Sequence, residues 1–216
     1  MHFNTVSESL HKVLKILMQA EVFSDFRLVG GTSLSLQLGH RVSVDIDLFS
    51  DLQYGTIDFK AIDSFIEKTF PFHSHFSTLE TAIGKSYNIG NSKNDFIKLD
   101  IYYTDQFIRP YLVVNDLRLA TLDEIVAMKI DIIQRGGRKK DFWDLHRLLD
   151  DYSISKMLDL HEERYGYNHD KETILNNFIK FEMADEDFDP ECLLGKHWEF
   201  IKEDITEEVE KFINNH

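Results

Sequence analysis

The chain has 216 residues, of which 43% are hydrophobic, and it contains one cysteine, Cys192. This composition is typical of a folded protein with a sizeable core, and it excludes an intrachain disulfide. The formal net charge is −14. Most of it belongs to residues 150–216, which hold 19 acidic and 7 basic side chains, so this part is unsuited to binding nucleic acid through a broad basic surface.

The first residues place no basic stretch before an apolar run, and no apolar run approaches the length needed to cross a bilayer. We therefore expect no signal peptide, no membrane partner and a reducing, cytoplasmic location. The acidic C-terminal part could meet a basic partner protein. A solvated helical surface also explains its charge, and we favour that interpretation.

Hydrophobic periodicity predicts an α+β fold with a boundary near residue 120, which separates a mixed α/β part (1–120) from a helical part (121–216). Turn residues, namely Gly84, Gly90 and the polar run 91–94, are expected to separate strands. In chain order, the sequence predicts a helix over 6–20, a strand over 26–29, a helix over 32–38, a strand from residue 41, a helix over 58–68, strands within 72–103 and helices from residue 121.

The strand predicted from residue 41 carries the most informative pattern. Its polar members alternate with apolar residues, and strand side chains have a period of two. The polar set would therefore share one face and the apolar set would enter the core. The polar residues are Arg41, Ser43, Asp45 and Asp47, and the apolar residues are Val42, Val44, Ile46 and Leu48.

Asp45 and Asp47, side by side on one face, would repel each other unless a cation lay between them. Magnesium takes such oxygen ligands, usually together with substrate phosphates. Gly30 and Gly31 open the preceding helix, and backbone N–H groups at a helix N-terminus form an anion pocket. The glycine pair by itself is typical of a tight turn, but a metal site beside an anion site indicates nucleotide chemistry.

A third carboxylate, Asp100, lies on a predicted strand whose apolar residues alternate with Lys98, Asp100 and Tyr102. If this strand lies beside the Asp-x-Asp strand, Asp100 completes a cluster able to hold two metal ions. The alternative is a charge at the strand surface, paired with Lys98 or an arginine. The sequence does not decide between these two interpretations.

Lys129 lies four residues from both Ile125 and Ile133 on a predicted helix, among apolar side chains. A lysine in that position must extend its ammonium to solvent or find an anion, and we interpret it as a cation for a phosphate. Asp141 borders the apolar stripe of the next helix, where a first-turn carboxylate is also favoured by the helix dipole. Asp144 is expected to pair with Lys140 or Arg147.

One dense basic group surrounds the glycines at 136 and 137. It could hold phosphates or an RNA backbone, and a solvated loop is an equally good explanation. Its members are Arg135, Arg138, Lys139 and Lys140.

The motifs of residues 26–149 together resemble the AbiEii/AbiGii toxin family of nucleotidyltransferases, within the DNA-polymerase-β-like superfamily. They are Gly-Gly-Thr-Ser-Leu-Ser-Leu, Arg-x-Ser-x-Asp-Ile-Asp-Leu-Phe, a helical lysine and Lys-Asp-x-x-Asp-Leu. The resemblance implies a small mixed β-sheet flanked by helices and followed by a helical region. It also implies Mg²⁺ (or Mn²⁺), a nucleoside triphosphate substrate and an RNA acceptor, with tRNA favoured. The implied biological role is that of a toxin in a bacterial toxin–antitoxin or phage-defence system, with an antitoxin as a partner.

The matching positions carry implied roles. Gly30, Gly31, Thr32 and Ser33 would bind the triphosphate, with Arg41 and Ser43 in support. Asp45 and Asp47 would bind metal and act in catalysis, with Asp100 as a further metal ligand. Lys129 would contact the nucleotide phosphates, and Asp141 is the acidic residue of the last motif.

Two alternatives remain open. The same fold could transfer a nucleotide to a small-molecule or protein hydroxyl. The chain could also be a non-catalytic nucleotide-binding regulatory module, although clustered carboxylates are of little use to a protein that only binds nucleotide.

Overall fold

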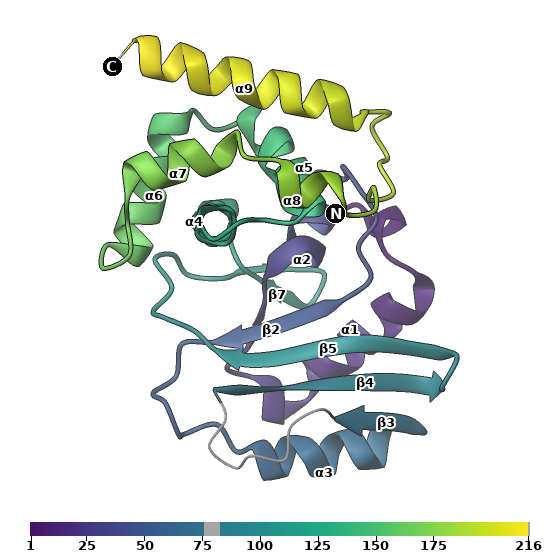
Figure 1. Ribbon diagram of the computed structural model, residues 1–216. Helices are drawn as coiled ribbons and strands as arrows, with labels where there is room; N and C mark the ends of the chain where they lie inside the picture. Colours follow the sequence, from purple (N-terminus) through teal and green to yellow (C-terminus); the bar gives the residue numbers. More distant parts are fainter. Residues whose placement is uncertain (76–82, 216) are drawn as a thin grey trace. The chain divides into compact units, whose positions relative to one another are not determined.

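The structure is a computed structural model that describes residues 1–75 and 83–215 (Figure 1). Its chain divides into two compact units. The first unit comprises Met1–Leu38 and Ser43–Thr121, and the second comprises Gly39–Val42 and Leu122–His216. Four residues just before the Asp-x-Asp therefore belong to the helical unit rather than to the unit that contains their neighbours in the chain.

The first unit is built on one mixed sheet. Within the described residues its strand order is β3-β4-β5-β2-β1-β7-β6, with β2–β5 and β1–β7 parallel and the other pairs antiparallel. The strands are β1 (Arg27–Leu28), β2 (Ile46–Ser50), β3 (Phe72–His75), β4 (Gly84–Ser92), β5 (Asp95–Tyr103), β6 (Leu112–Val114) and β7 (Leu117–Leu119), and the helices are α1 (Glu8–Gln19), α2 (Gly30–Leu38) and α3 (Phe59–Thr69).

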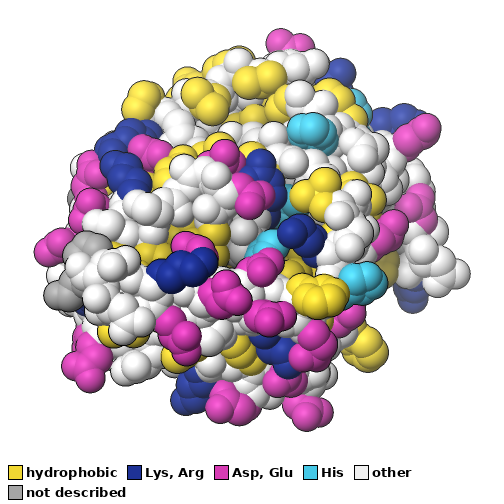
Figure 2. Space-filling view, turned by 90° about the horizontal axis from the view of Figure 1, so that it is seen from above, with side chains coloured by type: hydrophobic (Ala, Val, Ile, Leu, Met, Phe, Trp, Pro, Cys, Tyr) yellow, Lys and Arg dark blue, Asp and Glu magenta, His cyan; other side chains and the backbone are white. Residues whose placement is uncertain are grey.

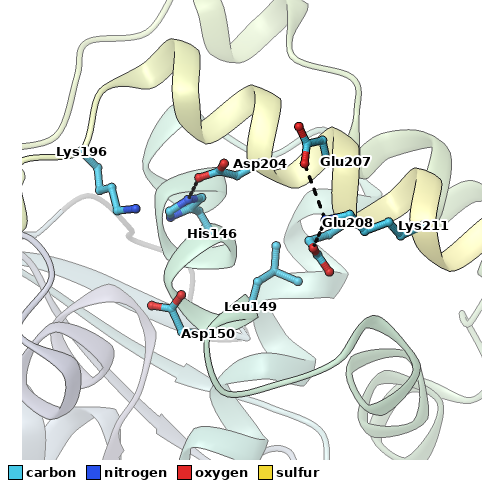
Figure 3. Close-up of a pocket in the computed structure, with 8 residues that line it drawn as sticks. All are labelled: His146, Leu149, Asp150, Lys196, Asp204, Glu207, Glu208 and Lys211. Carbon is cyan, nitrogen blue, oxygen red and sulfur yellow. Dashed lines mark hydrogen bonds and ion pairs between the residues drawn. The ribbon is translucent and has the colours of Figure 1, made fainter.

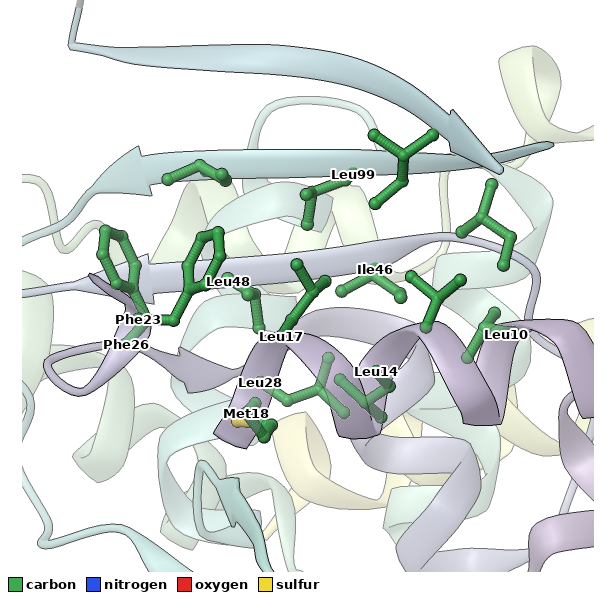
Figure 4. Packing of buried hydrophobic residues seen from close by; sticks show 14 of the residues in the cluster. Leu10, Leu14, Leu17, Met18, Phe23, Phe26, Leu28, Ile46, Leu48 and Leu99 are labelled. Carbon is green, nitrogen blue, oxygen red and sulfur yellow. The ribbon is translucent and has the colours of Figure 1, made fainter. Parts of the chain in front are cut away.

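The core of the first unit lies between α1 and one face of this sheet (Figure 4). The Ser7 side chain accepts a hydrogen bond from the Leu10 backbone N–H and so begins α1. Leucines at helical spacing along α1 then face the apolar residues of the central strands, and both sets are buried. The packed side chains include Leu10, Leu14 and Leu17 from the helix and Leu28, Ile46, Leu48 and Leu99 from the sheet.

The prediction of an unbroken strand from residue 41 was wrong. Strand β2 begins only at Ile46, and the Val44 side chain, expected in the core, is 67% exposed. Arg41 forms an isolated antiparallel bridge with Cys192 in the second unit. A half-buried strand needs alternating residues, but alternation alone does not make a strand. Here Arg41 pairs with a segment of the second unit and does not join the sheet of the first unit.

The second unit is helical, as its periodicity predicts. Its elements are α4 (Leu122–Gln134), α5 (Lys139–Leu149), α6 (Ile154–Tyr165), α7 (Lys171–Phe178), α8 (Glu182–Asp185) and α9 (Trp198–Asn214). Helix α4 packs against α5, α6 and α7, and α9 packs against these same three helices. Gly136, with φ +91°, accommodates the left-handed backbone that follows α4.

The sequence misplaced two turns and did not predict two strands. Gly84 and Gly90 lie within β4, where a Cβ at Gly90 would meet the backbone of Asp95 at 2.2 Å, so the glycine permits a close strand approach rather than a turn. The short strands β6 and β7 carried no pattern long enough to predict them. Part of the segment predicted as strands within 72–103, residues 76–82, lies outside the described residues.

No helix in the described part of the chain is long and apolar enough to span a bilayer.

Candidate functional site

Asp47 and Asp100 lie on neighbouring strands. Strands β2 and β5 run parallel, and these two residues are register partners. Residues that flank them along the strands, such as Leu48 and Leu99, are fully buried in the core beneath α1. Because side chains alternate along a strand, the two carboxylates lie on the opposite face of the sheet. Asp45 comes just before β2 and is also partly exposed.

The start of α2 contacts the Asp47 carboxylate. Gly30 has φ +66°, a left-handed conformation that favours glycine. A Cβ at Gly30 would lie 2.5 Å from Asp47 Oδ2 and 3.3 Å from its Cγ, so only glycine leaves room for this carboxylate. The helix N-terminus, where backbone N–H groups favour anions, therefore directly adjoins a carboxylate suited to a metal ion.

Three predicted nucleotide-binding residues are buried and support this corner of the first unit. Thr32 Oγ1 lies 2.8 Å from Ser43 Oγ and also bonds the backbone carbonyl of Asp45. Ser33 Oγ accepts a hydrogen bond from Gln37 Nε2 at 3.2 Å. The Thr32 hydroxyl thus ties the start of α2 to the segment that leads into the Asp-x-Asp.

In the structure Asp100 forms an ion pair with Lys98, which is the second of the two alternatives that the sequence left open. Lys98 Nζ lies 2.5 Å from Asp100 Oδ2, whereas Asp100 Oδ1 is buried without a hydrogen-bond partner. Burial is the largest single effect and lowers the pKa of Lys98, whereas the hydrogen bond to Asp100 and the charge of that carboxylate raise it. The negative charges of Asp45 and Asp47 act in the same direction, and the net result is a raised Lys98 pKa. Lys98 is thus a cation within the field of three carboxylates.

These residues fit a divalent cation that is only partly coordinated by protein. Among residues 1–75 and 83–215, no group of three or more His, Cys, Asp or Glu side chains is arranged to hold a metal ion. Magnesium, however, is commonly held by one or two carboxylates and completed by substrate phosphates and water. The Asp47 carboxylate beside the helix N-terminus and the unbonded Asp100 Oδ1 supply oxygen donors of that kind.

Lys129 in the second unit is buried and binds two carboxylates. Its Nζ lies 2.7 Å from Asp141 Oδ1 and 2.6 Å from Asp144 Oδ2, and its side chain is only 4% exposed. Burial lowers the pKa of Lys129, but the charges of Asp141 and Asp144 raise it above its usual value. The lysine placed among apolar residues therefore has protein carboxylates as its partners in this structure.

Asp144 is the centre of this cluster, which the sequence did not reveal. Its Oδ1 lies 2.7 Å from His40 Nε2 and from Arg41 Nε, and its Oδ2 accepts from Arg41 Nη2 at 2.8 Å. Burial would raise the pKa of Asp144, but Arg41 and Lys129 hold it well below its usual value. The expected partners, Lys140 and Arg147, were wrong because α5 turns Asp144 into the unit's interior. A carboxylate one turn from Asp141, beside the large residues Phe142 and Trp143, was the available signal.

Asp141 also caps its own helix, as the alternative interpretation predicts. Its Oδ2 accepts a hydrogen bond from the backbone N–H of Arg138 at 3.0 Å, while Oδ1 binds Lys129. The Asp141 carboxylate therefore caps the start of α5 and is also one of the two anions that bind the Lys129 ammonium. Removing it would weaken both the helix start and the pairing of the buried lysine.

The basic group near Gly136 is paired with acidic side chains. Arg138 makes two 3.0 Å contacts to Asp187, and Lys139 lies 2.9 Å from Asp189. Arg135 pairs with Asp131 one turn before it. On the face shown in Figure 2, Lys and Arg side chains likewise lie among Asp and Glu side chains rather than in one basic area.

A pocket of about 230 Å³ in the second unit lies apart from the predicted residues (Figure 3). It lies between α5 and α9, and a 2.7 Å contact joins His146 Nε2 to Asp204 Oδ2 at its wall. Acidic side chains outnumber basic ones in its lining. The lining residues are His146, Leu149, Asp150, Lys196, Asp204, Glu207, Glu208 and Lys211.

Known proteins resemble this chain over nearly its whole length. An uncharacterized protein of Aquifex aeolicus (strain VF5) is 28% identical, with 96% of each chain covered. A putative nucleotidyltransferase from Helicobacter pylori has the same fold, with a TM-score of 0.59 at 18% identity over 94% of this chain and 91% of that one. MenT4, a nucleotidyltransferase toxin from Mycobacterium tuberculosis H37Rv, gives a TM-score of 0.61 at 15% identity over 93% and 81%.

The family model for the nucleotidyl transferase AbiEii toxin of type IV toxin–antitoxin systems matches residues 12–214. That range includes the Asp-x-Asp beside the helix N-terminus and the buried lysine with its carboxylates. The fold that the sequence predicted is confirmed by the nucleotidyltransferase structures that it resembles. With motifs, fold and family model in agreement, this chain belongs to the AbiEii family of toxin nucleotidyltransferases.

Proposed function

We propose that this enzyme transfers a nucleoside monophosphate from a nucleoside triphosphate to RNA, with tRNA as the favoured acceptor. It would act in the cytoplasm with Mg²⁺ or Mn²⁺, as the toxin of a toxin–antitoxin or phage-defence system, restrained by an antitoxin. The observation that carries the proposal is the Asp47 carboxylate lying against Gly30 at the start of α2. An anion site at a helix N-terminus beside a carboxylate ligand suits a metal-bound phosphate.

In this proposal residues 1–120 form the nucleotidyltransferase core. Backbone N–H groups that follow Gly30 would bind triphosphate oxygens, and the buried hydroxyls of Thr32, Ser33 and Ser43 would hold that backbone in place. Asp45 and Asp47 would hold the cation, with Asp100 as a further ligand. Such a cation, when bound, neutralises phosphate charge and lowers the pKa of an attacking hydroxyl.

Residues 121–216, in the same proposal, carry the second set of catalytic residues. Lys129 and Asp141 match the family's last motifs, and they form a buried ion pair held by Asp144 and Arg41. A preorganised ammonium stabilises charge that develops on a phosphate during transfer. Arg41 is thereby assigned a supporting role, through Asp144.

A second candidate acceptor, a small-molecule or protein hydroxyl, is favoured by one observation. Three of the four cations near Gly136 are paired with Asp131, Asp187 or Asp189, which reduces their attraction for an RNA backbone.

The experiment that separates the acceptors uses wild-type protein with magnesium and each of the four α-labelled nucleoside triphosphates in turn. Total cellular RNA, a protein extract and a metabolite extract would be offered separately. Label in a discrete RNA species supports the proposal. Label only in protein or metabolites supports the second candidate, and no label with any acceptor contradicts both.

A further inference from the structure

Lys98 lies beside the carboxylates of Asp45, Asp47 and Asp100 and supplies a positive charge to them. Lys98 and Asp100 are two residues apart on β5, so their side chains leave the strand on the same face. The Lys98 side chain is 46% exposed, and its ammonium holds only one oxygen of Asp100. A lysine on a flexible, half-exposed stem can leave this position without disturbing the core.

The carboxylate that Lys98 holds is incompletely satisfied. Asp100 Oδ1 is buried without a hydrogen-bond partner, and Asp100 is in register with Asp47, whose carboxylate lies close to Gly30. A buried acceptor without a partner is costly, so a cation that bound Asp100 Oδ1 together with the Asp47 carboxylate would gain binding free energy. Lys98, however, places a positive charge where that cation would enter, and like charges repel.

We propose that Lys98 is a built-in counter-ion that competes with a divalent cation for Asp100. The cation alone then binds weakly, and binding becomes tight only when nucleotide phosphates supply the negative charge that offsets Lys98. Binding of metal and nucleotide would thus be coupled. This inference rests on the proposed function, because the divalent cation belongs to it.

The test measures Mn²⁺ binding to the full chain without nucleotide, from the electron paramagnetic resonance signal of free aqueous Mn²⁺. Lys98→Met removes the charge and keeps most of the stem, so it should lower the dissociation constant about tenfold. Lys98→Arg keeps the charge and should bind Mn²⁺ as wild type does. Lys93→Met, at the exposed turn of the same hairpin, changes net charge equally and should have no effect.

Equal Mn²⁺ affinity of Lys98→Met and wild type would overturn the inference, as would the absence of binding to either protein. A gain that survived Asp47→Asn in the Lys98→Met background would overturn it too, because the new site would then lie elsewhere. The proposed function is judged separately, by nucleotide labelling with wild type. A protein that labels no acceptor but shows the Lys98 effect would contradict the proposed function alone.

Discussion

At the scale of single residues, the most demanding position is Asp144. It is fully buried and holds Arg41 through two hydrogen bonds while also contacting His40 and Lys129. A buried carboxylate is tolerated only when cations and donors replace its lost hydration. Arg41 and Lys129 are buried as well, so each of these cations also depends on the Asp144 carboxylate to replace its lost hydration.

Asp144→Ala should therefore lower the free energy of unfolding by about 3–5 kcal/mol, since it leaves two buried cations short of a partner. Chemical denaturation of the variant and wild type measures this. Asp150→Ala, at an exposed position on the following turn, is the control and should change stability little. A loss as small as that of the control would show that the cluster is not a stabilising network.

The same carboxylate predicts how stability depends on pH. The Asp144 pKa is lower in the folded protein than in the unfolded chain, where it is about 3.9. Its contribution is therefore fully present above that value and is lost as pH falls through the folded-state pKa. Unfolding free energy measured between pH 7 and pH 3 should decline less steeply in Asp144→Asn than in wild type. Parallel pH profiles would contradict this.

Gly30 allows a residue-scale test of the site itself. In Gly30→Ala the new methyl group would lie 2.5 Å from the Asp47 carboxylate. The alanine would also have to adopt the left-handed backbone conformation of Gly30. Gly195 has the same φ of +66° with nothing within 4 Å, so Gly195→Ala isolates the backbone term, about 1–2 kcal/mol.

We expect Gly30→Ala to lose about 1 kcal/mol more than Gly195→Ala, and to lose nucleotide transfer because Asp47 is displaced. Thermal unfolding and the labelling assay measure the two effects. Equal destabilisation with unchanged transfer would mean that the contact with Asp47 has no role.

At the scale of elements, periodicity predicted helices well and short strands poorly. Helix α3 (Phe59–Thr69) was expected over 58–68, because its buried residues recur at helical spacing. The prediction of a strand from Arg41 was wrong, because the sequence pattern cannot show that residues 40–42 bond to residues 191–193. The Lys98 pair with Asp100 was foreseen as an alternative, whereas His40 and Asp144 were missed because their partners lie about a hundred residues away in the chain.

Helix α9 offers a prediction at this scale. Ile201 is fully buried, whereas its neighbour Phe200 is 59% exposed. Ile201→Ala should cost about 2–4 kcal/mol of unfolding free energy, and Phe200→Ala less than about 0.5 kcal/mol. Urea denaturation of both variants measures the difference. Similar losses at the two positions would mean that α9 is not packed as described.

At the scale of the whole molecule, the fold and family were predictable because one motif, Gly-Gly followed by Asp-x-Asp, is specific. The family model covers residues 12–214 and so includes the acidic C-terminal region, which carries no motif recognised in the sequence. Two statements about site chemistry were beyond the sequence. They are the enclosure of Lys129 by two carboxylates and the pairing of Arg41 with Asp144, both of which depend on packing between separate segments of the chain.

The most direct test of the central claim compares nucleotide transfer by wild type, Asp45→Asn and Asp47→Asn with α-labelled nucleoside triphosphate, magnesium and cellular RNA. Asp95→Asn, on an exposed part of β5, is the control for charge. We predict a labelled RNA species with wild type and the control. We also predict a loss of at least about a hundredfold in both Asp-x-Asp variants, whose unfolding should match wild type. Near wild-type labelling by Asp47→Asn would contradict the proposed site.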